Sequence, residues 1–164
     1  MKTVQQQLIQ YAGYHRDKRN VITHLVGIPL IYFAVVSLLS RPELASIYVP
    51  ITPALILASL LCLYYLKLHV GLGLIMVAFN ACTLFCAHQL SDMTTSDWLT
   101  ISIGAFVIGW VFQFVGHYFE GKKPAFVDDL IGLLIGPLFI VAEVCFAMGL
   151  FKSLHQDIEA AFSH

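Results

Sequence analysis

Five long apolar runs limit what this chain can fold into more than any other feature of its sequence. They cover residues 21–40, 44–66, 68–90, 98–120 and about 126–151. A helix that crosses a bilayer needs about 20 consecutive apolar residues, so each run is long enough to form one. Charged residues make up only 12% of the chain, about half their share in a soluble domain. The sequence therefore predicts an all-α integral membrane protein with a single membrane domain, residues 1–164.

The connections between these runs are short and contain turn-forming residues. They lie at Ser40–Pro42, Ser91–Asp97 and Gly121–Pro124. Helices joined by short loops pack antiparallel to their neighbours, so we expect a compact bundle of about five transmembrane helices. Five glycines are expected to let helices approach closely: Gly27, Gly109, Gly116, Gly132 and Gly136. The last run contains a proline and three acids, Pro137, Asp128, Asp129 and Glu143. It is therefore expected either to span the membrane or to form a broken, re-entrant element.

Residues 1–20 are predicted to form an amphipathic, interfacial helix ahead of the first span. One helical face carries Val4, Leu8, Tyr11, Ala12 and His15. Such a helix can lie in the headgroup plane or pack over the mouth of the bundle. Asn20 is predicted as the N-cap of the helix that follows.

Basic residues are distributed unevenly between the two ends of the expected bundle. Seven fall at the end that holds the N-terminus: Lys2, Arg16, Lys18, Arg19, Lys67, Lys122 and Lys123. Arg41 and Lys152 are expected at the other end, where Glu143 and His88 should also lie. Because cytoplasmic loops are enriched in Lys and Arg, we expect the N-terminus in the cytoplasm.

Ionisable residues gather at the same N-terminal end of the expected bundle. Four histidines and three carboxylates fall there: His15, His24, His69, His117, Glu120, Asp128 and Asp129. A single histidine at a membrane interface is usually solvated or hydrogen-bonded, but ionisable groups at membrane depth are costly and commonly functional. Two distant stretches, residues 11–29 and 113–125, are therefore predicted to meet and build one metal site.

The residue types in this group favour a non-haem metal. His117 and Glu120 share a helix face with Gln113, as inward-pointing ligand pairs do in di-iron carboxylate bundles. Imidazole binds Zn, Cu, Fe and Ni, and two or three histidines with one carboxylate hold Fe(II) for oxygen chemistry. The four cysteines lie inside apolar runs and are expected to act as small buried hydrophobes. Structural zinc is therefore not expected, whereas a zinc hydrolase stays open at this point.

Other functions are compatible with the same residues. Intramembrane histidines and acids can relay protons in a small proton-coupled transporter or channel, although the polar residues here gather at one end. Two histidines on neighbouring helices can bind haem, and the chain can also be a purely structural membrane protein. A net charge of −1 gives no sign of nucleic-acid binding.

Two motifs resemble those of the 2-hydroxy fatty acid dioxygenase family of phytosphingosine breakdown. The first is Tyr11-x3-His15-x4-Asn20-x3-His24-x2-Gly27-x-Pro29, and the second is Gln113-x3-His117-x2-Glu120-x3-Pro124-Ala125. The resemblance extends to Asp128, Pro137 and Glu143 and covers almost the whole chain. The family includes a fungal endoplasmic-reticulum protein and bacterial proteins formerly of unknown function.

This resemblance implies an Fe2+-dependent dioxygenase that acts by alpha-oxidation. It would use O2 to cut a 2-hydroxy fatty acid between C1 and C2, leaving a fatty acid one carbon shorter. The family's catalytic, metal-binding histidines carry over to His15, His24 and His117. His69 and Glu120 are further candidate ligands, with Glu120 either binding the metal or supporting a residue that does.

The resemblance and the charge pattern together suggest how substrate would arrive. Five basic residues would attract its carboxylate: Arg16, Lys18, Arg19, Lys122 and Lys123. The acyl chain would lie between helices or in the bilayer. The location of the fungal member is not carried over. We expect a multi-pass protein of a bacterial inner membrane, with the N-terminus and the metal site on the cytoplasmic side. The number of metal ions and the oligomeric state stay open.

Overall fold

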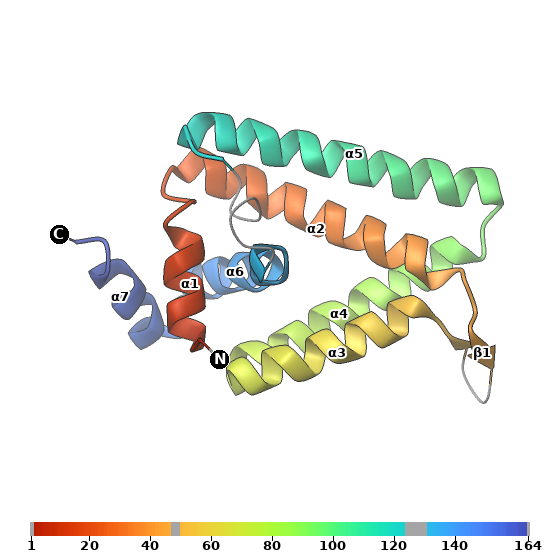
Figure 1. Cartoon of the computed structure of the whole chain (residues 1–164), viewed down its shortest axis with the longest axis horizontal. Coiled ribbons are helices and arrows are strands. Elements are labelled where there is room, and N and C mark those ends of the chain that lie inside the picture. The colour runs from red at the N-terminus through yellow and green to blue at the C-terminus, as the bar shows by residue number, and fades with distance from the viewer. Residues whose placement is uncertain (1, 47–49, 124–130, 164) are drawn as a thin grey trace.

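The computed structural model describes residues 2–46, 50–123 and 131–163, which are almost entirely helical (Figure 1). The helices are α1 (Val4–Ala12), α2 (Lys18–Ser40), α3 (Pro53–Leu68), α4 (Val70–Ser91), α5 (Thr95–Glu120), α6 (Ile131–Ala147) and α7 (Lys152–Ala160). Two short antiparallel strands, β1 (Ala45–Ser46) and β2 (Pro50–Ile51), lie between α2 and α3. The predicted all-α class is therefore confirmed.

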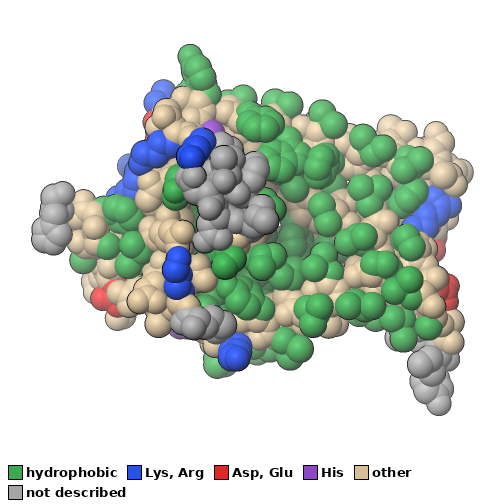
Figure 2. Space-filling model, viewed as in Figure 1, with side chains coloured by type: hydrophobic (Ala, Val, Ile, Leu, Met, Phe, Trp, Pro, Cys, Tyr) green, Lys and Arg blue, Asp and Glu red, His purple; other side chains and the backbone are tan. Residues whose placement is uncertain are grey.

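Of the helices in the described residues, three (α2, α4 and α5) are long and apolar enough to cross a membrane. The count rises to four if α6 and α7 form one bent span, whereas α3 is apolar but has only 16 residues. Hydrophobic side chains cover the middle of the face in Figure 2, and Lys and Arg gather mainly toward its left end. These features support a multi-pass membrane protein, but the predicted number of five spans is not confirmed.

The predicted second span, residues 44–66, is shortened at its start. Its first residues belong to the β1–β2 pair, and the helix begins only at Pro53. Proline fits the first turn of a helix, where its missing N–H costs no hydrogen bond. The side chain of Thr52 caps the helix by accepting a hydrogen bond from the N–H of Leu55 at 3.2 Å.

The predicted fifth span, about 126–151, is broken. Residues 124–130 lie outside the described residues, and with them Asp128 and Asp129. Helix α6 ends at Ala147, and α7 leaves it at an angle of 111°. In the turn between them Gly149 and Phe151 have φ angles of 78° and 51°. Glycine adopts positive φ freely, and this reversal lets the chain turn back.

Helix α7 returns to α1 and does not lead to the opposite end of the molecule (Figure 1). Ile158 and Phe162 pack into the same hydrophobic core as Leu8. The guanidinium of Arg16 donates hydrogen bonds of 2.9 and 3.0 Å to the two carboxylate oxygens of Glu159. The end of the chain therefore covers the N-terminal helix.

This return corrects two expected positions. Lys152 begins α7 and so lies on the side of α1, not at the opposite end. Glu143 was expected toward the opposite end of the bundle, but the charges that act on it belong to His155, Glu159 and Arg16. Lys152 thus becomes the eighth basic residue at the N-terminal end of the bundle.

Helices α2 and α5 lie side by side and form the most extensive helix pair in the described structure (Figure 1). A Cβ on Gly27 would lie 2.8 Å from the carbonyl oxygen of Gly109, and one on Gly109 would lie 2.9 Å from that of Gly27. The two backbones therefore touch, and the expected role of these glycines in close packing is confirmed. This contact brings the first turns of α2 next to the last turns of α5.

Candidate metal centre

Three histidines from three parts of the chain meet at the end of the α2–α5 pair. His15 lies in the segment between α1 and α2, His24 in α2 and His117 in α5. They are 3%, 0% and 7% exposed, and one ring nitrogen from each lies within 4.8 Å of the other two. The structure thus brings together the two distant stretches that the sequence analysis paired.

Backbone carbonyls orient two of the three rings. Nδ1 of His15 lies 2.8 Å from the carbonyl oxygen of Tyr11, and Nδ1 of His24 lies 3.0 Å from that of Asn20. A carbonyl oxygen only accepts hydrogen bonds, so each Nδ1 carries the proton and each Nε2 keeps a free lone pair. Metal-binding histidines are commonly oriented in this way.

The ring nitrogens that face one another are spaced to fit a metal ion. Nε2 of His24 and Nε2 of His117 are 3.3 Å apart, close to the separation of about 3.3 Å for two imidazoles bound at about 2.0–2.1 Å to one tetrahedral ion. Nε2 of His15 is buried and has no hydrogen-bond partner among the described residues. A buried polar atom without a partner is costly, and a shared metal ion would satisfy it.

Burial keeps the His15 ring in the form that binds metals. Its ring stacks on Tyr11 at 4.2 Å between centroids, with the planes 6° apart. Loss of solvent lowers the pKa of His15 to about 4. The imidazole is therefore neutral at physiological pH, with a lone pair available to a cation.

Glu120 holds the segment that carries His15 in place. Its carboxylate accepts hydrogen bonds from the backbone N–H of Arg16 at 3.0 and 3.1 Å and of Asp17 at 2.8 Å. It also accepts one from the side-chain amide of Asn20 at 3.1 Å. In the part of the chain that the structure describes, no carboxylate or cysteine joins the three histidines. Glu120 thus holds the segment next to the histidine cluster without joining the cluster.

Replacing Glu120 with alanine is expected to weaken metal binding by about ten- to hundredfold, the usual effect of losing a group that orients a ligand. The three imidazoles remain, but the segment bearing His15 loses its anchor. Titration against a chelator of known affinity measures the change, and Glu120→Gln, which keeps one acceptor oxygen, should lose less. Complete loss of metal from the alanine variant would show that Glu120 is itself a ligand. Unchanged affinity would show that its hydrogen bonds do not matter.

His69, the other candidate ligand, does not lie in this cluster. Its Nδ1 accepts a hydrogen bond from the N–H of Leu72 at 3.1 Å, which makes it the N-cap of α4. Its ring packs edge-on against Phe151. Helices α3 and α4 both contact α2, but the turn between them, which carries His69, lies apart from the first turns of α2 (Figure 1). Lying at the same end of the bundle therefore did not place His69 at the same site.

The expected N-cap of α2 is also wrong. Asp17 caps the helix, accepting a hydrogen bond from the N–H of Arg19 at 2.8 Å. Asn20 is instead fully buried and links Glu120 to the carbonyl oxygen of Tyr14. The sequence signal for this role was the position of Asn20 between His15 and His24 in the first motif.

A mostly apolar cavity of about 340 Å³ opens beside His117. Residues of α1, α2, α3, α5 and α6 line it, with His117 and Gln113 among them, and it extends along α5 as far as Phe106. At a rise of about 1.5 Å per residue, that stretch of α5 is about 16 Å long. An extended hydrocarbon chain advances about 1.25 Å per carbon–carbon bond, so about 13 bonds fit along it.

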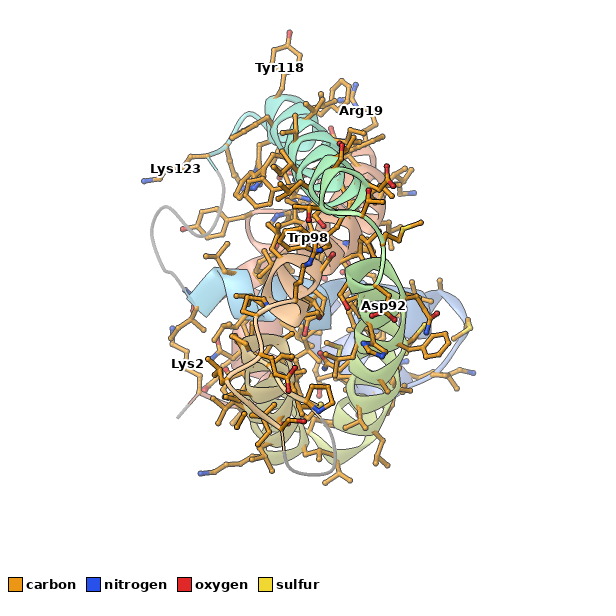
Figure 3. The ribbon with its side chains drawn as sticks, turned by 90° about the vertical axis from the view of Figure 1, so that its right-hand side faces the viewer. Lys2, Arg19, Asp92, Trp98, Tyr118 and Lys123 are labelled. Atoms are coloured by element: carbon orange, nitrogen blue, oxygen red, sulfur yellow. The ribbon has the colours of Figure 1, made fainter. Side chains whose placement is uncertain are left out.

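The five basic residues expected to attract substrate are not part of this cavity wall. Arg16 is paired with Glu159, and Arg19 with Asp17 at 2.7 Å. Lys122 donates a hydrogen bond to the carbonyl oxygen of Gly13 at 2.8 Å. Figure 3 shows Arg19 and Lys123 pointing away from the body of the molecule. These five basic residues can therefore attract an anionic substrate only through the electrostatic field that they create outside the cavity.

Comparison with known proteins agrees with the motifs. Residues 1–148 match the family described as "2-hydroxy-palmitic acid dioxygenase Mpo1-like". The chain is 33% identical over 156 residues to the 2-hydroxy-palmitic acid dioxygenase MPO1 of Saccharomyces cerevisiae, which covers 93% of this chain and 86% of the yeast protein. No solved structure matches the chain. The resemblance seen in the sequence is confirmed, and the chain belongs to the Mpo1-like family.

Proposed function

We propose that this protein is an Fe2+-dependent dioxygenase that cleaves 2-hydroxy fatty acids between C1 and C2. The product is a fatty acid one carbon shorter. The observation that carries the proposal is the set of three buried imidazoles at the end of an apolar cavity. The yeast relative, whose name states that it acts on 2-hydroxy-palmitic acid, supports the substrate class.

His15, His24 and His117 would hold the iron, since one ring nitrogen from each lies close to the other two and the rings are buried. Bound Fe2+ would supply the ability to react with O2, which no amino-acid side chain provides. Three histidine ligands leave further coordination positions open. The surrounding apolar residues would keep bulk water away from the reacting carbon.

The overall reaction needs no second oxidant. Oxidising a 2-hydroxy acid to the shorter acid and CO2 removes four electrons, and reducing one O2 accepts four. One molecule each of shortened acid, CO2 and water balances every atom. Oxygen uptake and product formation are therefore expected in equal amounts.

Two alternatives from the sequence analysis are less consistent with the geometry. Two histidines that share a haem iron lie on opposite sides of the macrocycle, about 4 Å apart at nitrogen. The pair His24 and His117 is closer, at 3.3 Å, with His15 beside it. A proton pathway needs a continuous series of polar groups through the bilayer depth, whereas the buried hydroxyls of Ser37 and Ser102, away from the centre, bond to each other.

We also propose that the protein lies in a bacterial inner membrane with the metal centre on the cytoplasmic side. Its basic residues, which gather near α1 and the ends of α2 and α5, support this orientation.

Incubation with 2-hydroxypalmitate tests the proposed function. Protein purified without oxygen and loaded with Fe2+ should convert it to pentadecanoate when O2 is admitted, as measured by mass spectrometry. Palmitate, which lacks the 2-hydroxyl, should not be converted. An iron-loaded, folded protein that leaves 2-hydroxypalmitate and its shorter homologues intact would refute the proposal.

Replacing Val35 with tryptophan is expected to shift the preferred chain length. Val35 lines the cavity and lies 11 residues beyond His24 in α2, about 16 Å along the helix. The larger ring would obstruct the chain of 2-hydroxypalmitate but not the shorter chain of 2-hydroxyoctanoate. The kcat/KM for 2-hydroxypalmitate, divided by that for 2-hydroxyoctanoate, should therefore fall at least about tenfold. Val107→Trp is the matched control, since Val107 is exposed on α5. An unchanged ratio would mean that the acyl chain lies elsewhere.

A further inference from the structure

One polar side chain in the cavity wall has no role in the arrangement described so far. Gln113 is 7% exposed, lies one helical turn before His117 on α5 and lines the cavity with it. Its amide interacts with the imidazole of His24. Its Nε2 is nevertheless buried without a hydrogen-bond partner in residues 2–46, 50–123 and 131–163.

The packing around Gln113 keeps the amide in this position. A Cβ on Gly27 would lie 2.7 Å from Nε2 of Gln113, so the absence of a side chain at Gly27 leaves the space that the amide occupies. The folded chain therefore buries a hydrogen-bond donor next to the histidines and leaves it unused. Buried donors are normally paired, and those that are not point to a missing partner.

The described wall of the cavity carries no permanently charged side chain that could bind an anion. In the described part of its wall there is no Lys or Arg, and the nearby basic residues Arg16, Arg19 and Lys122 have partners outside it. A fatty acid that places its chain along the apolar wall must bring its carboxylate to the end with Gln113 and His117. A neutral amide can donate to that carboxylate without adding positive charge beside three imidazoles.

We propose that Nε2 of Gln113 donates a hydrogen bond to the carboxylate of the 2-hydroxy fatty acid and so positions C1 and C2 next to the three histidines. This inference rests on the proposed function, because it takes the substrate class from it. It assigns recognition of the acid head group to a buried amide and not to the basic residues on the surface.

Kinetics and ligand competition with Gln113→Met test the inference. Methionine is nearly isosteric with glutamine but has no N–H to donate. The variant should keep its iron, because the three histidines are unchanged, and its KM for 2-hydroxypalmitate should rise by about ten- to hundredfold, the range expected for losing a hydrogen bond to a charged group. Gln113→Leu should have the same effect on KM. It replaces Gln113→Met in the experiment if Gln113→Met does not fold. Gln89→Met, the same change at an exposed position on α4, should match the wild type.

Competition by hexadecane-1,2-diol separates head-group recognition from general damage. This diol has the chain and the 2-hydroxyl but no carboxylate. In the variants the affinity for the acid should fall while the inhibition constant of the diol stays within about twofold. Equal weakening of both ligands, loss of iron, or an unchanged KM would each overturn the role of Gln113. A wild-type enzyme that turns over 2-hydroxypalmitate in that same assay would still support the proposed function.

Discussion

Replacing His24 with alanine is expected to remove the bound iron and to lower turnover of 2-hydroxypalmitate by more than about a hundredfold. Losing a group that only orients a ligand already costs about ten- to hundredfold, and His24 would be a ligand itself. Its Nε2 faces that of His117 at 3.3 Å, and its ring is fully buried. Iron content per chain and the rate of pentadecanoate formation measure the two effects.

His88→Ala is the control for this experiment. His88 is exposed in the last turn of α4, far along the bundle from the three histidines. Its variant should keep both iron and activity. His117→Ala should repeat the result of His24→Ala, which guards against a folding defect specific to one buried position. Full iron and full activity in either ligand variant would show that the cluster is not the metal site.

Replacing Gly116 with alanine is expected to disrupt the centre almost as severely without changing any ligand. A Cβ at this position would lie 2.2 Å from the hydroxyl oxygen of Thr23, 2.5 Å from Oδ1 of Asn20 and 2.9 Å from Nδ1 of His24. Overpacking of this kind costs about 1–3 kcal/mol, and α5 must move away from α2 to relieve it. His117 moves with α5, so the variant should lose thermal stability in detergent and most of its iron.

Gly104→Ala is the matched control on the same helix. A Cβ there has no heavy atom within 4 Å among those compared, and alanine favours a helix over glycine by about 1 kcal/mol. This variant should be as stable as the wild type or slightly more so, with full iron. If Gly116→Ala also keeps wild-type stability and iron, the close approach of α2 and α5 at the site is wrong.

The sequence predicted the histidine cluster because its members lie where two spans begin and end. His15, His24 and His117 each flank or terminate an apolar run, and antiparallel spans bring such ends to one side of the membrane. The structure adds how they are oriented. The carbonyls of Tyr11 and Asn20 that hold the rings belong to the backbone, so residue types alone could not identify them.

His69 was predicted wrongly because the order of the apolar runs only assigns a residue to one of the two ends of a bundle. Positions within one end depend on how the helices pack, and the α3–α4 turn lies apart from the first turns of α2 (Figure 1). The side chain of His69 accepts one hydrogen bond from the N–H of Leu72 and packs against the ring of Phe151.

The number of spans could not be read from apolar length either. The second run is long enough, but prolines at positions 50 and 53 move the start of α3 into it. The last run is interrupted by the turn at Gly149 and Phe151, and its amphipathic end is captured by α1 through Ile158 and Arg16. The capture of the last run depends on contacts between segments that are distant in the sequence, and apolar length alone does not predict such contacts.

Iron-edge X-ray absorption of protein reconstituted with Fe2+ tests the central claim most directly. The account predicts one iron per chain with three imidazole nitrogens among its nearest neighbours, and loss of these from a variant with His15, His24 and His117 all replaced by alanine. Iron bound by sulfur, or the same imidazole signal in the triple variant, would contradict it.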